Sequence, residues 1–239
     1  MTANEVRPAN DVCTRRLWLA RSVVVAIGLG LWFFTQSLIG SRTLDPTSNA
    51  AGIPLSRGDG LFHLTEPVNE ALHAHPQAAN ALLIASSAVI DALGIWLIVT
   101  SICGSSIRPF LGLLIVFALR QLTQALCVLP TPEGMIWHSP GWPSFLVTYS
   151  VANDFFFSGH TAIAVFGATQ LARLKRPAYI MLGIAIALFE IAAVIVLRAH
   201  YTMDVFTGAI VALWAATIAD RAAPIVDSAL ARLASKSKC

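Results

Sequence analysis

The feature that most limits how this chain can fold is a series of long apolar stretches with very few charges. Six stretches of about 20 residues stand out, at 17–39, 78–102, 109–129, 155–174, 178–197 and 201–219. A helix needs roughly 20 apolar residues to cross the hydrocarbon core of a bilayer. Helices also satisfy their own backbone hydrogen bonds there, where no water is available. We therefore predict an all-α, polytopic membrane protein, a bundle of six transmembrane helices.

Composition excludes the other broad classes. Only 12% of the residues are charged and the mean hydropathy is +0.69, whereas soluble domains carry about 25% charged residues. These values exclude a water-soluble globular protein and a disordered chain. The first stretch follows several arginines, as a signal peptide would, but it exceeds the 7–15 apolar residues that a signal peptide has. We predict that it is an uncleaved span.

The lysines and arginines predict the orientation. With six spans and a cytoplasmic N-terminus, the cytoplasmic side holds twelve of them and the opposite side three, which are Arg42, Arg57 and Arg198. Cytoplasmic loops carry the excess of positive charge in membrane proteins, so both termini should be cytoplasmic. The chain then divides into a cytoplasmic tail (1–16), a six-span domain (17–220) and a second cytoplasmic tail (221–239). The loops at 130–153 and 198–200 share the extracytoplasmic face.

Two polar segments at that face carry the residues best suited to catalysis. They cover 153–161 and 198–205, and each begins a predicted span, so His160 and His200 can face each other. His200 and Asp204 are spaced i, i+4, which on a helix places them on one face. The carboxylate can then hold one imidazole nitrogen and leave the other more basic. We predict that His200 attacks phosphorus to give a phosphohistidine and that His160 is the general acid.

The same segments offer groups that bind phosphate. Ser158 is a favoured helix N-cap, and Gly159 lets the backbone approach a ligand closely. Free amides at a helix N-terminus bind phosphate. Arg198 and Arg120 can add guanidinium contacts, although Arg120, near mid-span, can alternatively pair with Glu190.

Other features favour simpler interpretations. Asp91, like Glu190, is readily explained as a buried packing partner. The loop at 40–77 holds three histidines without ligand spacing, which we expect to be solvated. Trp137, Trp142 and 155–157 are typical of an interfacial aromatic belt. The four cysteines form no CxxC pair and predict neither a disulfide framework nor a zinc site. No cofactor or metal is expected, and the scattered basic residues give no support to nucleic-acid binding.

Three segments in order carry a resemblance to a known family. Residues 158–161 (Ser-Gly-His-Thr) and 200–205 (His-Tyr-Thr-Met-Asp-Val) resemble the two catalytic motifs of sphingomyelin synthases and inositol phosphorylceramide synthases, within the lipid phosphate phosphatase (type 2 phosphatidic acid phosphatase) superfamily. An upstream stretch, from Arg120-Gln121-Leu122-Thr123 to Leu129-Pro130-Thr131-Pro132, is similar to one in sphingomyelin synthases. Asp154, four residues before the serine, also fits. The resemblance covers roughly residues 78–220.

This resemblance implies a membrane transferase that moves a phospho-headgroup from a glycerophospholipid to a lipid alcohol resembling ceramide or diacylglycerol. It implies six spans with the site at the extracytoplasmic face, His200 as nucleophile, Asp204 as its partner and His160 as acid–base group. Asp154 and Tyr201 join the candidate substrate contacts with the residues named above.

The chain also departs from the family patterns. Phe157 replaces the proline of the phosphatase branch, whose Lys-x6-Arg-Pro motif is missing, and Ala199 replaces the acidic residue of sphingomyelin synthases. The headgroup therefore stays open.

Two alternatives to a transferase also stay open. A lipid phosphate phosphatase would use the same phosphohistidine and release the phosphoryl group to water. A non-catalytic transporter or scaffold has no need for the two histidines with the aspartate, and the inverted repeats common in transporters are not evident in the sequence.

Overall fold

The computed structural model describes residues 8–40, 58–127, 129–141, 144–147, 149 and 156–236. This part of the chain is all-helical, as predicted, with seven helices and no strand. The helices are α1 (Pro8–Gly40), α2 (Gly60–Ala74), α3 (Pro76–Cys103), α4 (Arg108–Leu126), α5 (Gly159–Ala172), α6 (Pro177–Val196) and α7 (Thr202–Lys236).

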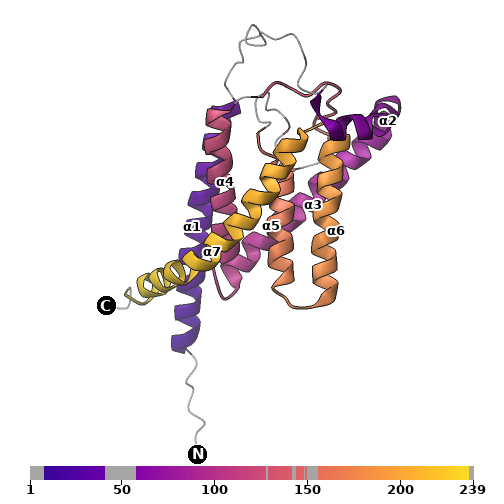
Figure 1. The fold of residues 1–239 in the computed structure, drawn as a ribbon. Helices are drawn as coiled ribbons and strands as arrows, with labels where there is room; N and C mark the ends of the chain where they lie inside the picture. Colours follow the sequence, from indigo (N-terminus) through magenta and orange to yellow (C-terminus); the bar gives the residue numbers. More distant parts are fainter. Residues whose placement is uncertain are drawn as a thin grey trace, which may run out of the picture.

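Six of these helices run along a bundle, and α2 lies across one end of it (Figure 1). The beginning of α1 and the end of α7 lie at the other end. Helix α5 has four neighbours, α3, α4, α6 and α7, and contacts α6 most extensively. The bundle is thus built around α5.

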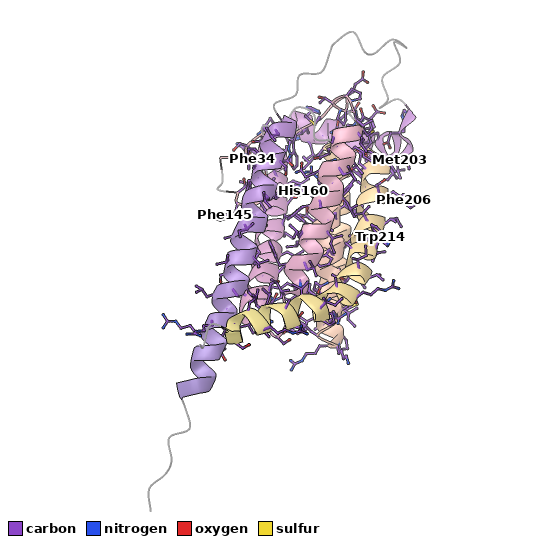
Figure 2. All side chains as sticks on the ribbon, turned by 90° about the vertical axis from the view of Figure 1, so that its left-hand side faces the viewer. Phe34, Phe145, His160, Met203, Phe206 and Trp214 are labelled. Carbon is purple, nitrogen blue, oxygen red and sulfur yellow. The ribbon has the colours of Figure 1, made fainter. Side chains whose placement is uncertain are left out.

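The surface of the bundle is apolar, as expected for a membrane protein. Within the described residues, five helices are long and apolar enough to cross a membrane, namely α1, α3, α4, α6 and α7. Figure 2 shows Phe34, Met203, Phe206 and Trp214 pointing outward, whereas His160 lies within the bundle. Such a broad exposed apolar surface is unfavourable in water and favourable in lipid.

Helix α5 differs from the predicted fourth span. It has only 14 residues, a length of about 21 Å at 1.5 Å per residue, which is less than the roughly 30 Å of the hydrocarbon core. The predicted start at residue 155 is too early, because Ser158 ends the preceding loop as the N-cap. Its hydroxyl accepts a hydrogen bond from the Thr161 amide at 3.3 Å.

The predicted loop at 40–77 is wrong for residues 60–74, which form α2. Asp59 is the N-cap, and its carboxylate accepts hydrogen bonds from the amides of Leu61 (3.1 Å) and Phe62 (3.3 Å). Phe62 and Asn69 are buried because they lie on the same helical face, two turns apart. Helix α2 therefore seals the end of the bundle.

Helix α7 extends well beyond the predicted sixth span. It continues to Lys236, so most of the predicted tail at 221–239 is helical. Leu230 packs there in a buried cluster with Val25 of α1 and Phe110 of α4. This packing holds the end of α7 against the bundle.

Candidate functional site

The two polar segments singled out in the sequence meet in the structure. The amide of Ser158 donates a hydrogen bond to the backbone carbonyl of Asp204 at 3.0 Å, which joins the start of α5 to the first turn of α7. One turn later, a Cβ atom added to Gly208 would lie 2.7 Å from the Ser158 carbonyl oxygen. A glycine at this position therefore permits the close approach of the two helices.

Both candidate catalytic histidines lie at this junction and are buried, with exposed fractions of 8% for His160 and 5% for His200. His200 and Arg120 both lie within electrostatic range of the His160 imidazole. The Nε2 atom of His160 is buried and has no hydrogen-bond partner among the described residues. The structure thus places the two imidazoles close to each other.

His200 and Asp204 are neighbours, but they do not share a helix. The prediction of one helix through both residues is wrong, because α7 begins at Thr202 and His200 lies in the preceding bend. The contact itself is present, with the His200 Nδ1 atom 3.9 Å from the Asp204 Oδ2 atom. This distance is too long for a hydrogen bond and short enough for an ion pair when the imidazole is protonated.

The Asp204 carboxylate is fully buried and has a second contact that the spacing did not indicate. Its Oδ2 atom accepts a hydrogen bond from the Tyr201 amide at 3.0 Å. An acidic residue in the first turn that reaches back to the N-cap amide is one half of a capping box. The Oδ1 atom has no partner among the described residues. Asp204 therefore closes the first turn of α7 and keeps one oxygen uncommitted.

Asp59 belongs to the site and was missed in the sequence. Besides capping α2, its Oδ2 atom accepts a hydrogen bond from the Thr202 amide at 2.7 Å, and the Thr202 hydroxyl donates to its Oδ1 atom. The Asp59 carboxylate thus fixes the first residues of both α2 and α7. The first residue of α7, Thr202, lies two residues after His200. An Asp-Gly pair before an amphipathic run is a local signal for the first cap. No local pattern indicates the second contact, between Asp59 and Thr202.

Tyr201 is buried beside Asp204 and has two contacts within the protein. Its hydroxyl donates to the Pro130 carbonyl at 3.0 Å, and its ring stacks on Phe62 with centroids 5.7 Å apart. Burial, with smaller contributions from Asp204 and Asp59, raises the pKa of Tyr201 to about 12. The hydroxyl therefore stays protonated and holds the loop after α4.

Arg198 adopts a backbone conformation that usually belongs to glycine. Its φ is 50°, its amide donates to the Ile195 carbonyl at 3.0 Å, and the Ala199 amide donates to the Val194 carbonyl at 2.9 Å. This pair of bonds is the Schellman motif that ends many helices. A side chain in this left-handed region costs roughly 1–2 kcal/mol, which glycine avoids.

The Arg198 guanidinium contacts α2 and the loop after α4. It donates to the Glu133 carbonyl at 3.0 Å and lies 3.7 Å from the Glu66 carboxylate. It also lies 5.2 Å from the centroid of the Phe62 ring. These contacts give Arg198 a role in holding the loop over the site. This role is additional to the phosphate contact that the sequence predicts for Arg198.

Arg120 lies against the start of α5. Its Nε atom donates to the Phe157 carbonyl at 3.3 Å, and its Nη1 atom donates to Gln36 at 3.2 Å. A Cβ atom added to Gly159 would lie 3.1 Å from the Arg120 Nε atom. Of the two predicted partners, Arg120 thus lies at the start of α5, where the sequence predicts a phosphate contact, and not with Glu190.

Glu190 has another partner than Arg120. It is fully buried in α6, and its carboxylate accepts a hydrogen bond from the Ser86 hydroxyl of α3 at 2.7 Å. Asp91, also in α3, accepts bonds from the amides of Phe145 and Leu146, both at 2.9 Å. Both acidic residues are the packing partners that the sequence predicted.

The aromatic residues need a correction. The Trp137 ring meets the His160 ring edge-on, with centroids 5.2 Å apart, and lies 4.9 Å from the Tyr149 ring. Phe157 is fully buried in the core. The prediction of an interfacial belt is therefore wrong for Phe157, whereas for Trp137, which is partly buried, it stays a prediction. Trp142, residue 155 and the candidate Asp154 lie outside the described residues.

A protein-family model described as AtPDCT1/2 matches residues 58–221, a range that runs from Asp59 through both histidines to the middle of α7. No curated protein and no solved structure gives a significant match. The chain therefore belongs to the AtPDCT1/2 family, a sphingomyelin synthase-like family named for phosphatidylcholine:diacylglycerol cholinephosphotransferases.

Proposed function

We propose that this protein is an integral membrane enzyme that transfers phosphocholine from phosphatidylcholine to diacylglycerol. The observation that carries the proposal is the family match over residues 58–221, because that range includes His160, His200 and Asp204. The meeting of the two histidine segments at the start of α5 and α7 supports it from the structure. Choline is the headgroup that the family name indicates, where the motifs alone left the headgroup open.

The first half of the proposed reaction forms a covalent intermediate on His200. Its Nδ1 atom faces Asp204, so Nε2 is the nitrogen that attacks the phosphorus of phosphatidylcholine. The phosphorus–oxygen bond to the diglyceride breaks, and protonated His160 gives its proton to the leaving oxygen. The products are diacylglycerol and a phosphocholine–histidine whose positive imidazole is stabilised by the Asp204 carboxylate.

The second half reverses these steps with a new acceptor. His160 takes the proton from the hydroxyl of the incoming diacylglycerol, whose oxygen attacks phosphorus. The phosphorus–nitrogen bond breaks, a new phosphatidylcholine leaves, and both histidines regain their starting protonation. Ser158, Gly159 and Arg120 surround the start of α5, where amides and a guanidinium can stabilise charge on the phosphoryl oxygens.

Burial of the site supports transfer rather than hydrolysis. Both imidazoles are more than nine-tenths buried, and a closed site keeps water from a reactive intermediate. A lipid phosphate phosphatase would need a path for water to the same phosphorus. We retain that activity as the alternative outcome of the experiment below.

The proposed topology has six crossings, with α5 as the short central one. Six helices running end to end agree with the start of α1 and the end of α7 lying at one end of the bundle. Arg173, Lys175 and Arg176 lie in the turn between α5 and α6 at that end, which supports a cytoplasmic position for it. Cysteines placed at Ser139 should then be labelled from outside intact cells, and cysteines at Ser235 should not. Labelling of Ser235 from outside would invert the orientation.

The activity is tested with purified protein in lipid nanodiscs. The donor is phosphatidylcholine of one acyl composition and the acceptor is diacylglycerol of another, so that mass spectrometry identifies the exchanged product. We expect exchanged phosphatidylcholine from the wild type and from His138→Ala, an exposed histidine in the loop before the site. His160→Ala and His200→Ala should give none. Free phosphocholine without exchange would indicate a hydrolase, and product only with ceramide would indicate a different acceptor.

A further inference from the structure

A second polar site lies at the end of the bundle opposite the two histidines. A cavity of about 780 Å³ is lined there by the end of α3, the start of α4, the end of α5 and the middle of α7. Helix α5 connects the two sites, because His160 is in its first turn and Arg173 follows its last residue. At 1.5 Å per residue the sites are about 20 Å apart, so the cavity is separate from the reaction proposed above.

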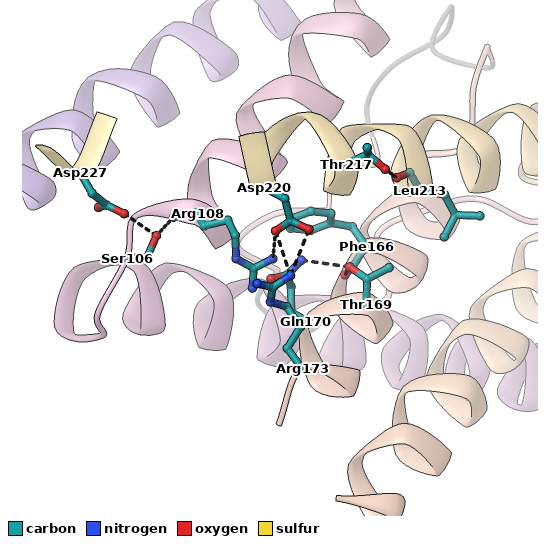
Figure 3. A network of polar contacts seen from close by, with 10 residues as sticks. All are labelled: Ser106, Arg108, Phe166, Thr169, Gln170, Arg173, Leu213, Thr217, Asp220 and Asp227. Carbon is teal, nitrogen blue, oxygen red and sulfur yellow. Dashed lines mark hydrogen bonds and ion pairs between the residues drawn. The ribbon is translucent and has the colours of Figure 1, made fainter. Parts of the chain in front are cut away.

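Two arginines in this cavity share one carboxylate. The Nη1 atom of Arg108 lies 3.2 Å from the Asp220 carboxylate, and the Nη1 atom of Arg173 donates to both of its oxygens at 2.9 and 3.0 Å (Figure 3). Within the described residues, the Nε and Nη2 atoms of both arginines have no hydrogen-bond partner in the protein. The group therefore keeps one uncompensated positive charge and several free donors, which match the oxygens of a phosphate.

The other carboxylate of the cavity does not neutralise this charge. Asp227 accepts hydrogen bonds from Arg21 (3.0 Å), the Ser106 hydroxyl (2.5 Å) and the Ile107 amide (3.0 Å). Its negative charge is balanced by Arg21, which is itself buried. Asp227 thus joins α1, the α3–α4 turn and α7, and leaves the arginine pair to an additional anion.

Gln170 provides independent support for a ligand site. Its side chain lines the cavity, is only 3% exposed and donates through Nε2 to the Thr169 hydroxyl at 2.9 Å. Its Oε1 atom is buried and has no hydrogen-bond partner among the described residues. A buried unpartnered acceptor costs roughly 1–3 kcal/mol. A hydroxyl or ammonium group next to the bound phosphate would remove that cost.

The apolar part of the lining identifies the source of the phosphate. Trp96, Leu174 and Pro224 line the same cavity, and Ile95 and Val99, the neighbours of Trp96 and Thr100 in α3, are 46% and 50% exposed. The cavity therefore offers a polar end for a headgroup beside a surface on which acyl chains can lie. A small soluble phosphate ester would leave the apolar part unused.

We propose that this cavity binds an anionic phospholipid whose phosphate lies between Arg108 and Arg173 and whose headgroup hydroxyl or ammonium donates to Gln170. A phosphodiester carries one negative charge and matches the single uncompensated positive charge of the site. The bound lipid would connect α4, α5 and α7 at the end where none of the proposed catalytic residues lie. The proposal is independent of the chemistry at His160 and His200.

Native mass spectrometry on the full-length protein tests the proposal, with phosphatidylglycerol and phosphatidylcholine of equal chain length added to detergent micelles. We expect the wild type to retain phosphatidylglycerol in preference. The double variant Arg108→Gln/Arg173→Gln should lose at least about tenfold in retention, as expected for two lost charge-assisted contacts. The matched control Arg176→Gln/Arg221→Gln removes two exposed charges outside the cavity and should retain the lipid. Equal losses in both double variants would show that general surface charge retains the lipid, and this result would contradict the proposed site.

Two further arms keep the test decisive if the arginine variant unfolds. Asp220→Asn frees both guanidinium groups, so retention should increase several-fold even though the protein loses two ion pairs. If the arginines serve only to bind Asp220, retention will not increase, and the proposal fails. Soluble glycerol phosphate at millimolar concentration should not displace the lipid. Displacement would show that the phosphate alone is the ligand and would overturn the assignment to a phospholipid.

Discussion

The carboxylates of Asp227 and Asp204, at the two ends of the bundle, differ in how their oxygens are partnered. At the end that holds Asp227, this carboxylate has three hydrogen-bond donors and joins three parts of the chain. At the other end, one oxygen of Asp204 and the Nε2 atom of His160 are buried without partners among the described residues. Because buried polar groups in proteins are nearly always hydrogen-bonded, unpartnered ones indicate a place that a substrate completes. The partners of Asp227 make it a structural group, whereas the unpartnered atoms of Asp204 and His160 lie where we propose the reaction.

Replacing the proposed nucleophile should give the largest effect. His200→Ala removes the group that attacks phosphorus and should lower kcat by roughly 10⁴–10⁶-fold, the range found when a nucleophile or its base is removed from other enzymes. The fold should be retained, because Asp204 keeps its bond to the Tyr201 amide. The measurement is exchange of labelled phosphatidylcholine alongside a thermal melt. Activity above about one hundredth of wild type, the lower end of a general acid–base contribution, would contradict the assignment.

Asp204→Asn separates the two tasks of that carboxylate. Both contacts are made by Oδ2, so the side-chain oxygen of the new asparagine can still accept from the Tyr201 amide, whereas the negative charge that stabilises a positive His200 imidazole is lost. We expect kcat to fall by up to roughly 10⁴-fold, as for the aspartate of serine proteases, with KM and the melting temperature nearly unchanged. A fall in melting temperature that accounts for the lost activity would make Asp204 a structural cap only.

Gly208→Ala tests whether the close contact between the helices positions the reacting groups. The new methyl would lie 2.7 Å from a backbone oxygen at the start of α5, so α7 must shift away from Ser158. Overpacking of this kind costs about 1–3 kcal/mol, and a shift of about 1 Å at a reacting group can cost roughly 10²-fold in rate. The control is Gly30→Ala in α1, where no atom lies within 4 Å of the new methyl. If both variants behave as wild type, the contact does not position the site.

The sequence predicted the parts of this molecule that depend on local composition. The ends of α3, α4 and α6 agree with the predicted spans within a few residues, because the apolar runs end abruptly at polar or proline-containing turns. Helix α2 was missed because its amphipathic run lies in a long polar segment. Local hydropathy placed the start of α5 too early, whereas the capping preference of Ser158 predicted it correctly.

The site was predictable in its residue types and not in its contacts. The spacing of His200 and Asp204 indicated that they meet, yet a bend rather than a helix brings them together. Asp59 and Gly208 act through partners far away in the sequence, Thr202 and Ser158. Such pairs become visible only when the helices are in place, because nothing in the neighbouring residues marks them.

At the end of the bundle that holds Asp227, we expect a substitution to lower stability and to leave the chemistry unaffected. Asp227→Asn removes the charge that balances Arg21, which is 2% exposed. Breaking a buried pair costs about 3–5 kcal/mol, and we expect somewhat less because the Asp227 side chain is 22% exposed. The melting temperature should fall clearly, while the exchange rate per folded molecule stays within about twofold, an energy of less than about 0.5 kcal/mol. A large loss of kcat in folded protein would mean that the two ends are coupled.

The smallest effect is expected at Arg198, where two variants separate the side chain from the backbone. Arg198→Ala and Arg198→Gly both remove the contacts to Glu133 and Glu66, but only glycine relieves the left-handed backbone. The glycine variant should therefore be more stable than the alanine variant by about 1 kcal/mol, measured as a difference in melting temperature.

The kinetics of the same two variants distinguish the roles of the Arg198 guanidinium. It holds the loop that carries Trp137, and Trp137 in turn contacts His160. A loosened loop weakens ground-state and transition-state binding alike, so KM should rise several-fold while kcat changes little. If Arg198 instead contacts the phosphoryl oxygens in the transition state, kcat should fall by roughly 10²-fold or more, equally in both variants. That result would restore the phosphate-binding role predicted from the sequence, and a fall in the alanine variant alone would assign the effect to the backbone.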